Sequence, residues 1–167
     1  MHLQITLHPA TVHFPIALLF LSSMCGLLYL YWRPLKELLV LTWWPMMLGW
    51  ISGAVGIGTG LLAQSGLPPQ SPYTQMLNWH IGTAIATLLA YGTLLYWRWL
   101  RRSTRMGASD QDVRNQDAAQ VNTGDPLLAD PHVRIWISLL LLSGVIVLLV
   151  SGWSGGQLVY TWGVNTP

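Results

Sequence analysis

The sequence contains very little charge for its length. Lys, Arg, Asp and Glu together make up 8% of the 167 residues, whereas an ordinary soluble domain carries roughly 25%. Since 52% of the residues are hydrophobic, much of a folded surface with this composition has to be covered by lipid. The formal net charge of +2 is too small to favour a nucleic acid as a partner. The composition therefore predicts an integral membrane protein whose first partner is the lipid bilayer.

Cysteine and the familiar catalytic motifs are also scarce. The single cysteine, Cys25, lies inside an apolar run, so the chain has no internal disulfide and no CxxC motif. The sequence contains no HExxH, no GxSxG and no P-loop. No apolar run carries paired carboxylates or a Lys/Asp relay, which disfavours a proton pump or an ion-coupled transporter. We therefore expect a non-catalytic subunit rather than an enzyme.

Four apolar runs are each long enough to cross about 30 Å of hydrocarbon as a helix. Their approximate bounds are 12–32, 38–63, 79–100 and 133–153, and none has a charged residue in its middle. The ten tryptophans agree with this reading, because Trp gathers where lipid meets water. We expect a single all-α domain, residues 1–167, built as an integral membrane four-helix bundle.

Basic residues occupy only two of the connections between these runs. Arg33 and Lys36 lie between the first and second runs, and the other six flank or occupy the connection between the third and fourth. The N-terminal segment, the 64–78 loop and the C-terminal tail contain no Lys or Arg. Because cytoplasmic loops are enriched in these residues, we expect both termini outside, on the periplasmic side of the cytoplasmic (inner) membrane.

The 103–130 segment is the polar stretch of the chain. It holds five of the six acidic residues and little apolar content. A segment of this composition buries too little apolar surface to fold by itself. We expect it to form a long, solvated and partly disordered cytoplasmic linker between helices three and four.

Histidine supplies most of the polar chemistry on the outer side. Four of the five histidines fall there under this topology, and they are His2, His8, His13 and His80. The first helix could start near Pro9 or near Pro15, and if it starts at Pro9, His13 lies one turn inside it. Ser71 and Pro72 suit the start of the third helix, and His80 then lies roughly 12 Å further along. His13 and His80 can therefore reach similar depth on two separate helices.

Two imidazoles that face each other across a helix bundle can hold a haem iron. His13 and His80 are thus candidate metal ligands, with His8 as a neighbouring partner or an alternative ligand. The same residues can instead hydrogen-bond between helices without any cofactor, and the sequence leaves both interpretations open.

One face of the second helix carries glycines at i, i+4, i+7 and i+11, namely Gly49, Gly53, Gly56 and Gly60. Glycine lets a backbone, or a planar macrocycle, approach closely. Gly49, Gly53 and Gly56 are therefore candidate cofactor-binding residues, although the pattern is also typical of plain helix–helix packing.

The C-terminal tail from residue 151 onward is uncharged and rich in glycine and aromatic residues. Because glycine accepts the left-handed conformation that ends helices, we expect Gly155 and Gly156 to end the fourth helix. The aromatic residues after them would then fold back over the histidines as a lid or anchor the chain at the membrane surface.

Both ends of the chain resemble those of the predicted membrane proteins called domain of unknown function 2231. The matching residues are His8-Pro9 with Val12-His13-Phe14-Pro15-Ile16-Ala17-Leu18, and Ser151-Gly152-Trp153-Ser154-Gly155-Gly156-Gln157-Leu158-Val159-Tyr160 with Gly163-Val164. His80 also fits the family, and the resemblance covers the whole four-helix chain. Members often occur beside, or fused to, Rieske-type iron–sulfur domains and other electron-transfer proteins. The resemblance thus implies a redox role, with His8, His13 and His80 as candidate ligands and any iron–sulfur centre in a partner.

These observations together predict a membrane electron-transfer subunit that binds haem b through His13 and His80 near the outer face. Bis-His ligation leaves iron without an open position, which suits electron transfer. The expected partners are membrane or extracytoplasmic redox proteins, such as a Rieske-type or cytochrome c partner, within a homo-oligomer or a larger complex. The alternative is a cofactor-free structural subunit of a larger membrane complex.

Overall fold

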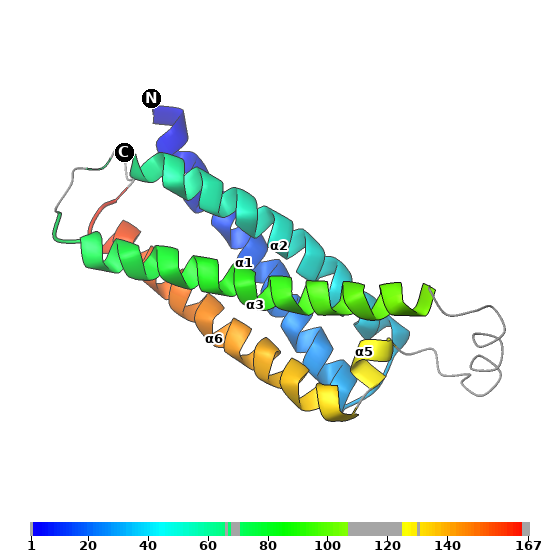
Figure 1. Ribbon diagram of the computed structural model, residues 1–167. Helices are drawn as coiled ribbons and strands as arrows, with labels where there is room; N and C mark the ends of the chain where they lie inside the picture. Colours follow the sequence, from blue (N-terminus) through cyan, green and yellow to red (C-terminus); the bar gives the residue numbers. More distant parts are fainter. Residues whose placement is uncertain (1, 66, 68–70, 107–124, 130, 165–167) are drawn as a thin grey trace, which may run out of the picture.

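The computed structural model describes residues 2–65, 67, 71–106, 125–129 and 131–164. These residues form four long helices and one short helix (Figure 1). The long helices are α1 (His2–Tyr31), α2 (Lys36–Gln64), α3 (Thr74–Met106) and α6 (Pro131–Tyr160), and the short helix α5 spans Pro126–Ala129. The expectation of an all-α chain with four long helices is confirmed.

Each long helix packs mainly on two neighbours. α1 lies against α2 and α6, and α3 also lies against α2 and α6. α1 and α3 therefore occupy diagonally opposite corners of the bundle, as do α2 and α6. The chain ends and the α2–α3 connection lie at one end of the bundle, called here the termini end (Figure 1). The α1–α2 connection and α5 lie at the opposite end, called here the linker end.

Three helices are long and apolar enough to cross a membrane. The segments are Thr11–Tyr31 in α1, Lys36–Gln64 in α2 and His132–Tyr160 in α6. Many of their large apolar side chains are exposed, among them Phe20, Leu48 and Ile146, as expected of a surface that meets lipid. α3 does not reach the same apolar content, because threonines and a run of arginines at its C-terminal part interrupt it. The fourth membrane span, expected at 79–100, stays a prediction.

Helix α6 continues past the glycine pair at which we expected it to end. It runs to Tyr160, and the chain turns only at Gly163, whose φ of 62° is left-handed. Gly155 and Gly156 therefore lie inside the helix, which corrects the expected helix end. The physical reason is that a backbone in an apolar environment keeps its internal hydrogen bonds, while small residues allow another helix to come close.

The segment predicted as the 103–130 linker is ordered helix at both of its ends. α3 extends to Met106, and α5 follows directly after Asp125. Leu127 and Leu128 are buried, with 0% and 6% of their surface exposed. These two leucines join the core because α5 packs on α3 and α6, a tertiary contact that the polar composition of the segment concealed.

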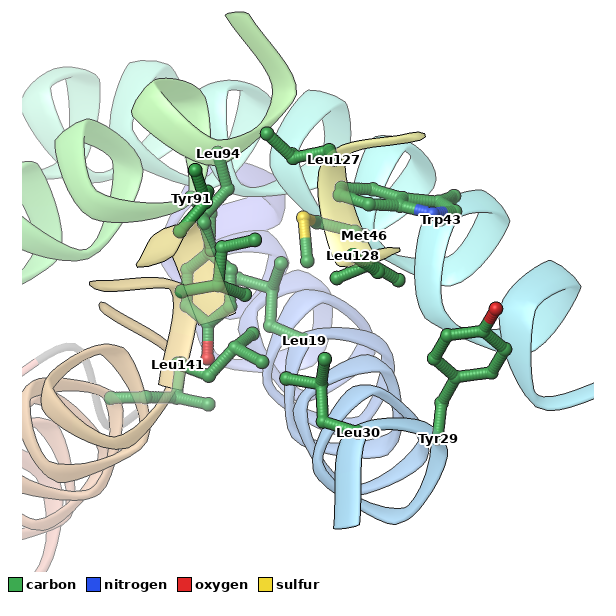
Figure 2. Packing of buried hydrophobic residues seen from close by; sticks show 13 residues of the cluster. Leu19, Tyr29, Leu30, Trp43, Met46, Tyr91, Leu94, Leu127, Leu128 and Leu141 are labelled. Atoms are coloured by element: carbon green, nitrogen blue, oxygen red, sulfur yellow. The ribbon is translucent and has the colours of Figure 1, made fainter. Parts of the chain in front are cut away.

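The apolar core lies in the part of the bundle nearer the linker end, because most of its residues come from the C-terminal halves of α1 and α3, the N-terminal halves of α2 and α6, and α5. Apolar side chains from all four long helices and from α5 meet there (Figure 2), and among them are Leu19, Met46, Tyr91, Leu127 and Leu141. Tyr91 is fully buried, and its hydroxyl lies 2.7 Å from the Ser23 hydroxyl across the α1–α3 diagonal. The Tyr91–Ser23 contact lies at the centre of the bundle, and a cavity lies further toward the termini end.

Candidate functional site

A cavity of about 380 Å³ lies on the termini side of this core. All four long helices contribute to its wall, together with Leu67 and the tail residue Val164. Its floor includes Leu19 and Leu148, both of which also belong to the buried core. The lining is mostly aliphatic, with a few polar side chains, which is the usual make-up of a small-molecule or cofactor site.

The structure brings the two histidines singled out in the sequence to this one cavity. His13 lines it from α1 and His80 lines it from α3. α1 and α3 lie diagonally across the bundle and run in the same direction. The two histidines therefore line the cavity from opposite walls. The His13 side chain is exposed and that of His80 is half-buried.

His80 is held by helix α6. Its Nδ1 lies 3.0 Å from the Ser151 carbonyl oxygen and 3.4 Å from the Ser154 hydroxyl oxygen. The imidazole lies directly over Gly155, because a Cβ atom at that glycine would come within 2.8 Å of His80 Cε1. His80 therefore packs on α6 through one ring edge while it lines the cavity.

Glycines form the other two walls. Gly53, Gly56 and Gly60 line the cavity from α2. From α6, the glycines at the wall are Gly152, Gly155 and Gly156. The absence of side chains at these positions on two diagonal helices is what leaves the space between them open.

Gly49, the third glycine predicted for cofactor binding, is not part of the cavity wall. A Cβ atom there would come within 2.9 Å of Leu19 Cδ2 and 3.1 Å of Leu18 Cβ. Gly49 therefore lets α1 and α2 approach each other, next to the floor of the cavity.

The structure places one further histidine, His132, away from the cavity and leaves the side chain of His8 undescribed. His8 belongs to α1, but its side chain is outside the described part of the structure. His132 lies exposed at the linker end of α6, far along the helix from the cavity. Among the described residues no group of three or more His, Cys, Asp or Glu side chains is arranged to hold a metal ion.

The described part of the tail packs beside the cavity. Val164 is buried and its backbone N–H donates to the Leu158 carbonyl at 2.9 Å, so the chain folds back after α6. Trp162 makes an edge-on contact with Tyr73, with the ring centroids 6.5 Å apart. Val164 thus supplies part of the cavity wall, and Trp162 ties the tail to the segment before α3.

Sequence reasoning missed the contacts that α6 makes with His80. Ser151, Ser154 and Gly155 are spaced i, i+3 and i+4, which puts them on one helix face. That spacing was visible in the sequence, but it carries meaning only if the helix continues through the glycine pair.

The family described as "Predicted membrane protein (DUF2231)" matches residues 4–167 of the chain. No curated protein and no solved structure matches it.

Proposed function

Because this chain belongs to the DUF2231 family of predicted membrane proteins, we propose a function that operates within the bilayer: electron transfer by a subunit that binds haem b. His13 and His80 would hold the haem iron. The observation that carries the proposal is that both histidines line one cavity from diagonal helices, while glycines of α2 and α6 form the walls between them.

The residues present fit a flat, largely apolar macrocycle. Aliphatic side chains surround the cavity, and glycines on α2 and α6 leave its two lateral walls thin. Imidazole nitrogens are suitable haem ligands, and two of them would complete the coordination of the iron. The lining residues include no Lys or Arg, so the carboxylates of such a group would depend on uncharged donors such as the Gln64 side-chain amide.

The histidines and the apolar residues of the cavity would have different roles. His13 and His80 would hold the group, and the packed core below Leu19 and Leu148 would exclude water from its inner side. When bound, the haem would supply a one-electron carrier that cycles between ferric and ferrous iron. Two imidazoles on the iron would suit electron transfer rather than oxygen chemistry.

The orientation completes the proposal. With the two connections that carry Lys and Arg, α1–α2 and α3–α6, in the cytoplasm, the termini end would face the periplasmic side of the cytoplasmic membrane. The cavity would then lie in the outer half of the bilayer, within reach of a Rieske-type or cytochrome c partner. α3 would be the fourth span, since it packs alongside two helices that are apolar enough to cross.

The direct test is the absorption spectrum of the purified protein, produced in a host with sufficient haem supply. We expect a Soret band, sharp α and β bands after reduction, and close to one haem per chain by pyridine haemochrome assay. A colourless, pure and folded sample that also takes up no added hemin would overturn the proposal.

A second candidate function is that of a cofactor-free structural subunit. The close approach of His80 to Gly155, and of Gly49 to Leu19, favours it, because both contacts hold helices together without a ligand. In that case the protein would be colourless, and it would copurify with a larger membrane complex from its native membrane.

A further inference from the structure

Three residues of α6 surround one edge of the His80 imidazole. We propose that Ser151, Ser154 and Gly155 form a positioning site that fixes His80 as the Nδ1–H tautomer and presents Nε2 as the coordinating atom. This inference rests on the proposed haem-binding function for its purpose, although the tautomer itself can be tested without haem.

The two contacts of Nδ1 with α6 indicate whether that nitrogen carries a proton. The Ser151 carbonyl oxygen, 3.0 Å from Nδ1, can only accept. The Ser154 hydroxyl donates its hydrogen to that same carbonyl at 3.0 Å, so toward Nδ1 at 3.4 Å it presents a lone pair. Nδ1 must therefore be the protonated nitrogen, and in a neutral imidazole the lone pair is then on Nε2.

The position of the ring is set by the absence of a side chain at Gly155. A Cβ atom there would stand 2.8 Å from Cε1 and 3.2 Å from Nδ1 of His80, which is closer than van der Waals contact permits. The next glycine, Gly156, has no atom within 4 Å of the corresponding position. Gly155 is thus required for the contact with His80, while Gly156 is not.

This arrangement matches what metal-binding histidines need. Such residues almost always donate their second ring N–H to a carbonyl, carboxylate or water, which fixes the ring and raises the basicity of the coordinating nitrogen. Ser154 is 2% exposed, so its hydroxyl is shielded from bulk water. Ser151, Ser154 and Gly155 of α6 would therefore have a chemical role beyond packing, because they would orient His80 on α3 as a ligand.

The tautomer is measured by long-range ¹H–¹⁵N correlation spectra of histidine-labelled protein in micelles, prepared without haem. His80 should show the pattern of an Nδ1–H imidazole in the wild type. An Nε2–H pattern would overturn the positioning site, whatever the outcome of the haem assay. If the wild type shows the Nδ1–H pattern and binds no hemin, the positioning contact stands and the proposed function fails.

The steric part is tested with a matched pair of variants, Gly155→Ala and Gly156→Ala. Both add one methyl group to neighbouring positions of the same helix, but only the first meets His80. We expect Gly155→Ala to shift the His80 resonances and to weaken hemin binding about 10-fold or more, with Gly156→Ala close to the wild type. Equal behaviour of the two variants in both measurements would overturn the assignment of Gly155.

Ser154→Ala is a milder variant that leaves the Ser151 carbonyl in place. Because it removes one acceptor from the Nδ1–H, the coordinating nitrogen should become less electron-rich and the midpoint potential of the haem should rise. A potential identical to that of the wild type would remove Ser154 from the positioning site.

Discussion

Arg98 of α3 and Asp125, the residue before α5, form an ion pair with 2.9 Å between Nε and Oδ2. The other carboxylate oxygen of Asp125 accepts the Leu127 backbone N–H at 3.1 Å. The Arg98 guanidinium also lies over the Trp43 ring of α2, 4.2 Å from its centroid. One arginine therefore holds α5 to both α3 and α2, and the leucines of α5 close the core at the linker end.

Removing this carboxylate should destabilise the bundle. The Asp125 side chain is 2% exposed and that of Arg98 is 18% exposed, so Asp125→Ala removes a buried carboxylate from a largely buried cation. We expect the free energy of unfolding to fall by about 3 kcal/mol, measured by reversible unfolding in mixed detergent micelles. Glu37→Ala, at an exposed acidic residue of α2, should cost less than about 1 kcal/mol. Equal losses in the two variants would show that the ion pair contributes nothing specific.

Gly144 and Gly58 should respond oppositely to replacement by alanine. A Cβ atom at Gly144 would lie 3.0 Å from Cζ of Tyr91, and Tyr91 is fully buried with its hydroxyl bound to Ser23. Gly144→Ala should therefore destabilise the protein by about 1–3 kcal/mol through overpacking. A Cβ atom at Gly58 meets nothing within 4 Å, so Gly58→Ala should be neutral or slightly stabilising because alanine favours the helix. The same unfolding assay compares them, and a neutral Gly144→Ala would contradict the packing at Tyr91.

The ligand assignment predicts that His13→Ala and His80→Ala each abolish haem retention. Both variants should still insert into the membrane and elute as folded protein, because the core below the cavity is untouched. His132→Ala, at the linker end of α6, is the matched control and should keep its full haem content. The haem-to-protein ratio of the three variants decides the matter, and full content in both cavity variants would remove these histidines from the ligand role.

The predicted orientation can be measured by cysteine labelling in a Cys25→Ala background. A cysteine at Thr74, in the first turn of α3, should react with a membrane-impermeant maleimide added to intact cells. A cysteine at position 116, in the expected cytoplasmic linker, should react only after the cells are opened. The reverse pattern would place the termini in the cytoplasm and move the cavity to the other side of the membrane.

Several features of the site could be anticipated from residue types and spacing. The apolar runs gave the four long helices, because helix formation in an apolar medium depends mainly on length and composition. The expected helix starts near Pro9 and Ser71 predicted a similar depth for His13 and His80, but α1 begins earlier, at His2, and α3 begins later, at Thr74. The sequence could not show that both histidines line one cavity. Two helices that run in the same direction can be neighbours, lie diagonally across the bundle or make no contact.

Other features depended on contacts between distant segments. Gly155 and Gly156 appeared to end a helix, but α6 continues through both of them, and Gly155 packs on His80 of α3. The acidic segment appeared to lack structure up to its C-terminal end. Asp125 nevertheless forms an ion pair with Arg98, and α5 packs on the core directly after it. In both cases the local sequence pattern describes an isolated segment, whereas a contact with another helix determines the structure of that segment in the folded protein.

The sequence by itself determined that this chain is helical and meets lipid. Hydropathy and charge can be read from the residues alone, without knowing which helices pack together. Tertiary structure alone decided which glycine faces a leucine, which faces a histidine and which faces the cavity. The reason is that glycines along one helix look alike in sequence, and only the helix packed against each of them determines whether the missing side chain permits a contact or leaves a space.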